Sequence, residues 1–341
     1  MALPATELVT PANAIVVPLP TFRLQAGEPL GDGLKRLSLD SLESAVSGFY
    51  DGEEAFGMAV HQARKTTKQL RALLRLVRSE VGEKAYRFES AEMSGISAMI
   101  SAVRSSAVRV ESVAVLRDLY GSFLAPDTFA ELSERLQSVH ARQESRVMED
   151  PVLVANVVDR FERAHDRYSS WPTDETSREV YGRGIRDSYE AIGSGLTETF
   201  RKGRHQMVAA YQSPSPARFH QWRKRVKYFR YQMEILTPLW PEVVLGMAIT
   251  LDRIGALLGQ DHDLADLLET VSSRIDLCPN PVERSLLKAL AEQRRSDLET
   301  ASRILGRRIY AETAKSLNTR FEAFWDSARH AHQLQATALP I

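Results

Sequence analysis

The chain has 341 residues, 43% of them hydrophobic, which is enough apolar material for one large domain or two of ordinary size. Its 44 Lys and Arg residues balance 44 Asp and Glu residues, so the total charge does not mark a nucleic-acid-binding or membrane-surface protein. The single cysteine, Cys278, excludes an internal disulfide and a cysteine-based metal site. A function based on charge therefore requires charges of one sign to gather locally.

The first residues lack the features of a targeting signal. No basic segment precedes an apolar run, and prolines at positions 4, 11, 18 and 20 interrupt the apolar residues. We therefore predict a flexible tail over residues 1–21. No apolar stretch approaches the ~20 residues that a transmembrane helix requires, so we expect a cytoplasmic protein without a membrane partner.

From Phe22 onward, helix-forming residues dominate and alternating strand patterns are lacking, so the predicted fold is all-α. Segments with a 3.6-residue apolar period, typical of packed antiparallel helices, lie between prolines at expected helix ends. These prolines occupy positions 126, 151, 172, 214, 216, 238, 241, 279 and 281. The polar stretch 171–177 divides the pattern into two helical halves, 22–168 and 178–330, and a C-terminal tail follows at 331–341.

An internal repeat supports this division. The segment HQARKTTKQLR at 61–71 is identical to HQWRKRVKYFR at 220–230 at six of eleven positions. The separation of the two copies is too long for a solenoid unit, and it indicates two copies of a helical subdomain.

In each copy, the cations fall on one side of the predicted helix. At 100° per residue, one stripe of the first copy holds His61, Arg64, Lys68, Arg71, Arg75 and Arg78, opposite a stripe of leucine and valine. Lys65 flanks this basic stripe. The second copy repeats the arrangement with His220, Arg223, Lys227 and Arg230, and it places Trp222 and Phe229 on the side expected to face the core.

The neighbourhood of these stripes is free of acids. Residues 55–79 and 199–233 hold six and nine Lys or Arg residues and no Asp or Glu. An exposed helix normally mixes signs, because opposite charges four residues apart stabilise it and like charges destabilise it. Cations that recur every ~5–6 Å along a helix favour a linear polyanion over one small phosphate ester. Arginine forks and lysine charges suit phosphate, and nearby phosphates favour protonated histidine.

The sequence resembles the CHAD domain family, α-helical domains named for conserved histidines. The resemblance extends from Phe22 to about Arg329 and rests on five segments in the family's order. They are FRLQAGEPLGDGLKRL at 22–37, which is similar to the family's opening helix, the two basic repeats, REVYGRGIRDSY at 178–189 and LLGQDHDLADLLE at 257–269. The resemblance implies two pseudo-symmetric four-helix bundles around a basic central channel that binds inorganic polyphosphate.

The resemblance also implies which residues bind polyphosphate. Those that match the basic motif are His61, Arg64, Lys65, Lys68, Arg71, His220, Arg223, Lys224, Lys227 and Arg230. Arg183 and Arg186 match a further basic helix, and Arg75 is added from the helical geometry. Where the family often has Arg-Asp-x-Asp-Val, this chain has Arg109-Val110-Glu111-Ser112-Val113, which predicts that the first half holds its ligand less rigidly. We find no alternating-glutamate strand of the accompanying triphosphate-hydrolysing domain.

We therefore expect a non-enzymatic polyphosphate-binding protein, without cofactor or metal, that is targeted to polyphosphate or its granules. The sequence identifies no protein partner. Single-stranded RNA is a weaker alternative, suggested by aromatic residues beside the second basic stripe. A phosphohydrolase or phosphotransferase that uses His61 or His220 is less favoured, because no carboxylate cluster is placed to hold a metal.

Two further segments receive structural interpretations. Asp261, His262 and Asp263 point about 100° apart on a helix and are not expected to converge on a metal ion. We assign Asp263 to a helix end or to the orientation of neighbouring charges. Gly193-Ser194-Gly195 lacks the spacing of a phosphate loop, and it predicts a helix break or a close packing contact.

Overall fold

The computed structural model describes residues 18–50, 56–171 and 184–338, with side chains to residue 334. Within these ranges the secondary structure is helical and contains no strand, which confirms the all-α prediction. The α-helices are α1 (Leu30–Ser47), α2 (Phe56–Leu76), α3 (Arg78–Val81), α4 (Glu83–Met99), α5 (Ser101–Tyr120), α6 (Ala130–Met148), α7 (Pro151–Ser169), α8 (Glu190–Gln212), α9 (Pro216–Ile235), α10 (Pro241–Ser273), α11 (Pro281–Ile309) and α12 (Ala314–Ala338).

Four of the prolines that were expected at helix ends begin the following helix. They are Pro151, Pro216, Pro241 and Pro281. Proline fits the first turn because backbone N–H groups there have no acceptor within the helix, so the N–H group that proline lacks is not needed. The side chains of Asp150, Ser215 and Asn280 cap three of these helices by accepting hydrogen bonds from backbone N–H groups.

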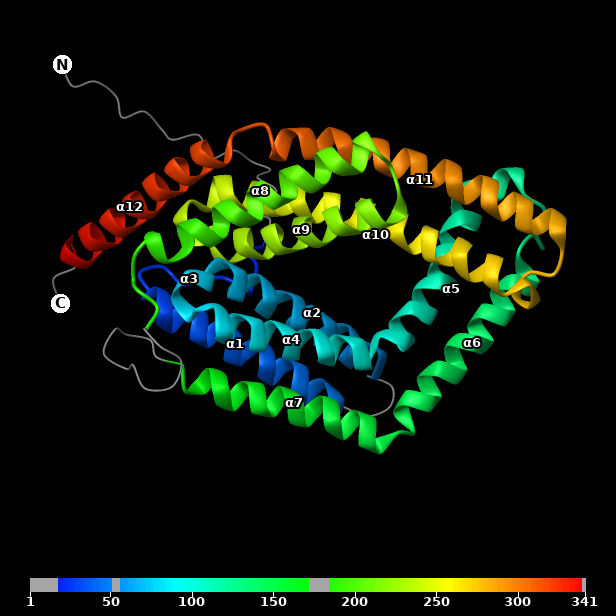
Figure 1. Cartoon of the computed structure of the whole chain (residues 1–341), viewed down its shortest axis with the longest axis horizontal. Helices are drawn as coiled ribbons and strands as arrows, with labels where there is room; N and C mark the ends of the chain where they lie inside the picture. Colours follow the sequence, from blue (N-terminus) through cyan, green and yellow to red (C-terminus); the bar gives the residue numbers. More distant parts are fainter. Residues whose placement is uncertain (1–17, 51–55, 172–183, 339–341) are drawn as a thin grey trace, which may run out of the picture.

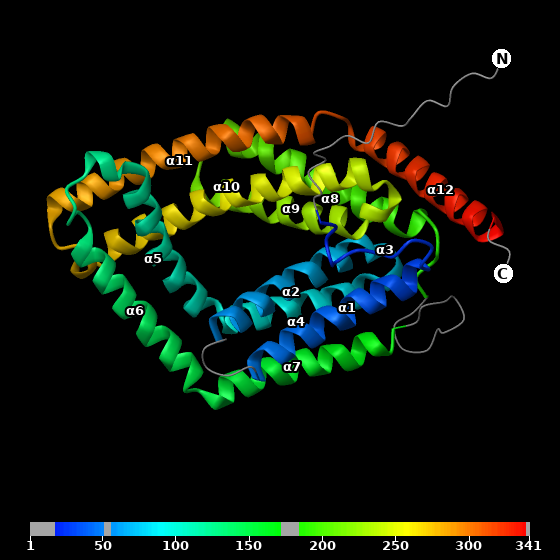
Figure 2. The same ribbon diagram turned by 180° about the vertical axis from the view of Figure 1, so that it is seen from behind.

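The helices form two layers that pack on each other and are also linked at one end by α5 and α6. Helices α1, α2, α4 and α7 lie together in one layer, and α8, α9 and α10 lie in the other (Figure 1). At one end, α5 and α6 run from the first layer to the far ends of α10 and α11, as both views show (Figure 2). Helix α2 packs against α9, so the two copies of the repeat are in contact.

The hydrophobic cores do not follow the predicted division into halves. The larger core combines apolar residues of α1, α2, α4 and α7 with residues of α8, α9, α12 and the first part of α10. The smaller core joins α5 and α6 to the second part of α10 and to α11. Each core therefore takes side chains from both halves. Most of the buried residues of α5 and α6 pack on α10 and α11, while Val103 of α5 and Val147 of α6 join the larger core. Of the polar stretch 171–177 that was predicted to divide the halves, Trp171 is buried in the larger core and residues 172–177 lie outside the described residues.

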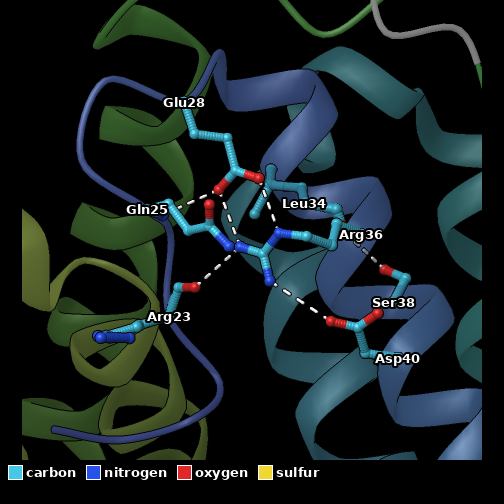
Figure 3. Close-up of polar contacts among 7 residues, drawn as sticks. All are labelled: Arg23, Gln25, Glu28, Leu34, Arg36, Ser38 and Asp40. Atoms are coloured by element: carbon cyan, nitrogen blue, oxygen red, sulfur yellow. Dashed lines mark hydrogen bonds and ion pairs between the residues drawn. The ribbon is translucent and has the colours of Figure 1, made fainter.

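The residues that precede the first helix, α1, already pack against the rest of the fold. The opening helix suggested for 22–37 begins only at Leu30, since Gly27 has a positive φ of 74° and Pro29 precedes the helix. Leu24 is buried and its N–H donates to the carbonyl oxygen of Ile235, 3.1 Å away. Arg36 holds this segment against α1 through two hydrogen bonds to the Glu28 carboxylate, at 2.7 and 2.8 Å (Figure 3).

The C-terminal tail that was predicted from residue 331 is helical as far as Ala338. Helix α12 continues to Ala338, because the sequence AHQLQATA contains good helix formers and no proline or glycine. Of the predicted N-terminal tail, residues 1–17 lie outside the described part of the chain. None of the described helices is both long and apolar enough to cross a membrane.

The Gly193-Ser194-Gly195 segment lies inside the continuous helix α8, so the predicted helix break is wrong. The predicted close packing contact is confirmed. A Cβ atom at Gly195 would stand 2.1 Å from the carbonyl oxygen of Leu76 and 2.3 Å from that of Arg75. Only glycine therefore lets α8 approach the end of α2 this closely.

Candidate functional site

The two basic stripes share one cavity. It has a volume of about 520 Å³ and lies between α2, α5, α9 and α10. Eight of the predicted site residues line it: His61, Arg64, Lys65 and Lys68 from α2, and His220, Arg223, Lys227 and Arg230 from α9. We refer to this space as the basic cavity.

The opposite sides of α2 and α9 hold these side chains in place. On α2, Leu70, Leu73 and Leu74 are fully buried. On α9, Trp222 and Phe229 are fully buried, as predicted. Because these apolar stripes are fixed in the core, the helical period directs the cations on the other side into the cavity.

Helix α10 approaches α9 closely through two glycines. A Cβ atom at Gly255 would lie 4.0 Å from Cγ of Lys227, and one at Gly259 would lie 3.3 Å from Nη2 of Arg223. Arg223 is therefore pressed against α10, and its buried Nε has no hydrogen-bond partner among the described residues. A guanidinium group held in this way keeps hydrogen-bonding capacity for a ligand.

The carboxylates of the cavity come from α10 and compensate only part of the positive charge. Asp252 lies 2.7 Å from Nη1 of Arg230, which also binds Glu234 at 2.8 Å. Asp266 lies 2.7 Å from Nε of Arg109 on α5. Asp263 faces the cavity, and within the described ranges it has no ion pair shorter than 4 Å. Arg230 is thus neutralised locally, whereas Arg64, Lys68, Arg223 and Lys227 have no ion pair within 4 Å among the described residues.

Burial changes the protonation of the lysines. It lowers the pKa of Lys227 to about 6, with further lowering by the charges of Arg223 and Lys68. It lowers the pKa of Lys68 to about 8, and Arg64 and Arg223 add to this. Desolvation disfavours the ammonium form unless an anion replaces the lost water. An anionic ligand in the cavity would therefore stabilise the protonated, cationic form of these lysines.

Two imidazole rings lie side by side in the cavity wall. The ring centroids of His220 and His262 are 4.1 Å apart, with the planes tilted by 44°. Burial, followed by the charge of His262, lowers the pKa of His220 to about 4. Burial also lowers the pKa of His262, and it lowers that of His61, where the charge of Arg104 adds to the effect.

The sequence did not identify Arg104, Tyr231 or His262 as residues of the cavity. Arg104 comes from α5, and its Nη1 binds the Glu111 carboxylate at 3.1 Å. Glu111 belongs to the segment that replaces the family's acidic motif, so this segment still orients one arginine of the site. No periodic signal marks Arg104, because it reaches the cavity only through the packing of α5 on α10. The sequence singled out His262 only as part of a possible metal site with Asp261 and Asp263, whereas the structure places it beside His220 in the cavity wall.

Two predicted site residues of α2 lie elsewhere, although they continue the same stripe. The crossing of α2 and α9 separates them from the cavity, and Nε2 of Gln232 donates there to the carbonyl oxygen of Ala72 at 3.2 Å. The guanidinium groups of Arg71 and Arg75 lie 5.7 and 4.0 Å from the ring centre of Tyr228. Arg75 lines another cavity, of about 460 Å³, and Arg78 belongs to α3 because α2 ends at Leu76.

The remaining predicted site residues are also not on the basic cavity. Lys224 is exposed on α9 and does not line it. Arg186 lies before α8, where its guanidinium binds the Glu80 carboxylate at 2.8 and 3.1 Å. Arg186, which was matched to a further basic helix of the family, therefore does not contribute to the basic cavity. Arg183 lies outside the described residues.

Asp261, His262 and Asp263 lie inside α10, well before its last residue, Ser273. The predicted helix-end role for Asp263 is therefore wrong. Asp261 is buried and binds Nε of Arg295 on α11 at 2.8 Å, whereas His262 and Asp263 face the basic cavity. In the described parts of the chain, no three His, Cys, Asp or Glu side chains are grouped to hold a metal ion.

Comparisons with known proteins agree with this architecture. The sequence matches the CHAD domain over residues 36–272. The structure is similar to that of PptA from Streptomyces chartreusis, with a TM-score of 0.54 and 16% identity over 84% of this chain and 100% of the other. It is also similar to the CHAD domain from the plant Ricinus communis, with a TM-score of 0.50 and 16% identity over 82% and 93% of the two chains. A search of curated protein sequences gave no match.

Proposed function

This chain belongs to the CHAD domain family, and from that premise we propose that its basic cavity binds inorganic polyphosphate without chemical turnover. The observation that carries the proposal is the convergence of two duplicated basic stripes on one cavity whose cations are largely uncompensated. The same binding would recruit the protein to polyphosphate granules.

The charge of the cavity favours a polyanion. Seven Lys and Arg side chains and three imidazoles line it, against three carboxylates. Two of these carboxylates, Asp252 and Asp266, are already engaged by Arg230 and Arg109. Bringing several desolvated cations together is unfavourable without an anion between them. A ligand with many closely spaced negative charges supplies that anion.

The shape of the stripes favours an extended ligand. His61 and Lys68 are seven residues apart on α2, which corresponds to about 10 Å along the helix axis. His220 and Lys227 have the same spacing on α9. A single phosphate ester contacts only part of one stripe, whereas a phosphate chain can contact both at once and gain affinity from the additional contacts.

The aromatic residues argue against RNA as the principal ligand. Base stacking requires an accessible ring face. Trp222 and Phe229 are fully buried, and Tyr228 is only 6% exposed. Tyr231 lines the cavity but is 5% exposed. RNA would therefore be held through its phosphates alone, and polyphosphate should displace it.

A larger cavity elsewhere in the fold does not fit the same ligand. It has a volume of about 600 Å³ and lies between α12 and the segment before α1. Trp240, Phe324 and Trp325 give it an apolar lining. Arg329 is bound to the Asp187 carboxylate there, so this space offers no group of uncompensated cations.

Calorimetric titration of the full chain with long-chain polyphosphate and with tripolyphosphate tests the proposal. We expect the long chain to bind at least tenfold more tightly per molecule, because only it reaches both stripes. Its affinity should fall steeply with added salt, since each neutralised phosphate releases counterion. Equal affinity for the two ligands would contradict the proposal.

Charge reversal locates the site. The variant R64E/K68E/R223E/K227E should lose at least a hundredfold in affinity for the long chain, because four contacts become repulsive. The matched control is K84E/R204E/R307E/K315E, which reverses four exposed cations that do not line the cavity. An equal loss in the control would show that binding is not specific to the cavity.

Phosphate release separates binding from catalysis. We expect no release of phosphate from tripolyphosphate or long-chain polyphosphate, with or without Mg²⁺, in a colorimetric assay. Release that disappears in a His61→Asn or His220→Asn variant would instead support the phosphohydrolase alternative.

A further inference from the structure

The pairing of His262 with His220 is a feature of the cavity that the repeated motif does not contain. His220 belongs to the basic stripe of α9, whereas His262 comes from α10, and their ring centroids are 4.1 Å apart. Nδ1 of His220 is buried and has no hydrogen-bond partner in the described structure. Both rings line the basic cavity. The pair therefore joins the walls formed by α9 and α10.

The charges around the pair are mixed but mainly positive. From α9 it faces Arg223, Lys224 and Lys227, and from α10 it faces Asp261, Asp263 and Asp266. The charge of Lys68 on α2 acts on Lys227, and the charge of Arg104 on α5 acts on Asp263. Asp261 is bound to Arg295 of α11, next to Glu299, and Asp266 is bound to Arg109 of α5. Asp263 is thus the unengaged carboxylate beside several cations.

Two adjacent buried imidazoles cannot both be protonated at moderate cost, although Asp263 compensates part of one positive charge. A positive charge on one ring disfavours a positive charge on the other at this distance, and burial disfavours both. In agreement, the pKa values of both histidines are lowered in the free protein. Phosphate oxygens beside the rings would reverse the balance, because an adjacent anion and a charge-assisted hydrogen bond both favour imidazolium.

We propose that His262 is a ligand-binding residue, and that it forms with His220 an imidazole pair that is neutral in the empty cavity and takes up protons from solvent when phosphate groups occupy it. This inference rests on the proposed function, because it requires a polyphosphate ligand. Binding is then linked to protons, so affinity increases as the pH falls from about 8 to about 6, by up to tenfold per pH unit for each proton taken up.

The first experiment observes the pair directly. Histidine-labelled protein is studied by NMR at pH 7 with and without long-chain polyphosphate. We expect the ring signals of His220 and His262 to move from neutral to protonated positions, with His262→Asn used to assign the His262 signal. His205, which is exposed on α8 away from the cavity, should keep its signal.

The second experiment measures the linkage. Titrations at pH 6, 7 and 8.5, each in two buffers of different ionisation enthalpy, give affinity and proton uptake together. We expect His262→Asn to lose about three- to tenfold in affinity at pH 6 and almost nothing at pH 8.5, with a smaller proton uptake at pH 7. His205→Asn is the matched control and should behave as wild type.

The outcomes separate the inference from the proposed function. If polyphosphate binds but the His262 ring stays neutral, or if His262→Asn loses the same factor at every pH, the inference is wrong and the proposed function stands. If wild-type protein binds no polyphosphate at any of these pH values, the proposed function is wrong and the inference fails with it. Because Lys227 also takes up a proton, residual uptake in His262→Asn is expected and supports the same linkage.

Discussion

The two copies of the basic motif have the same pattern of residues but different surroundings. On α9, Arg223 and Lys227 lie against α10 at Gly259 and Gly255, and His220 is partly buried. On α2, His61 is exposed. Burial lowers the pKa of Lys227 to about 6, but that of Lys68 only to about 8. The α9 stripe is therefore the more strongly desolvated of the two.

This difference shows that a repeated motif specifies which charges face the cavity, while the neighbouring helix decides how much water they keep. Charges in a drier environment interact more strongly with an anion. We therefore expect each α9 cation to contribute more to ligand binding than its α2 counterpart. The sequence predicted a less rigid grip in the first half, and the greater exposure of His61 agrees with that prediction without testing it.

The largest expected effect concerns the position of α2. Gly195→Ala would place a methyl group 2.1 Å from the carbonyl oxygen of Leu76, so α8 or α2 has to move. Such overpacking against backbone costs about 2–3 kcal/mol of unfolding free energy. Urea denaturation measures the loss, and Gly246→Ala, at a site with open space around the added Cβ, is the control. A loss below 1 kcal/mol would show that the two helices separate easily.

The next effect compares the two buried lysines. Lys227→Met should lower the affinity for long-chain polyphosphate about tenfold, and Lys68→Met about threefold, because the more desolvated charge makes the stronger contact. In the free protein, Lys227→Met should raise the thermal midpoint, since it removes a desolvated amine whose protonation burial disfavours. Equal effects of the two substitutions on affinity would contradict the comparison of the stripes.

The pH dependence of stability follows from the same lysines. Their pKa values in the folded protein lie below that of an unfolded lysine, ~10.4, so the unfolded chain binds more protons and stability rises with pH. The pKa of Glu299 is raised to about 7 by burial, which has the opposite effect below that pH. Thermal unfolding from about pH 7.5 to about pH 8.5 therefore reports mainly the lysines, because the raised pKa values of Cys278 and of the buried tyrosines act in the opposite direction at higher pH. The rise should be smaller in Lys227→Met and in the polyphosphate-bound protein.

The smallest effect concerns the contact between α9 and α10. Gly259→Ala would place a Cβ atom 3.3 Å from Nη2 of Arg223, the far end of a flexible side chain. We expect almost no change in stability and a loss of affinity of about twofold to threefold, since the guanidinium shifts by a few tenths of an ångström. A titration with long-chain polyphosphate measures it, and unchanged affinity would show that Arg223 does not need this position.

The residues of the basic cavity could be predicted where their placement depends only on the period of a single helix. The 3.6-residue period placed the cations of α2 and α9 opposite the buried residues Leu73, Trp222 and Phe229, and the structure agrees. The same reasoning failed for Arg71 and Arg75, because the period continues along a helix while the cavity ends where α9 crosses α2. The extent of a stripe is a property of the sequence, but the extent of a site is a property of packing.

The sequence by itself determined the all-α fold, the two basic stripes and the apolar faces that hold them, because helix propensity and periodicity are local properties of the chain. Only the tertiary structure decided that α5 and α10 complete the cavity with Arg104, His262 and Asp263, and that Glu80 engages Arg186. These residues are far apart in the sequence, and their approach depends on how the helices pack. The pKa differences between the two stripes arise from the same cause, because desolvation is set by the neighbours that packing brings to each side chain.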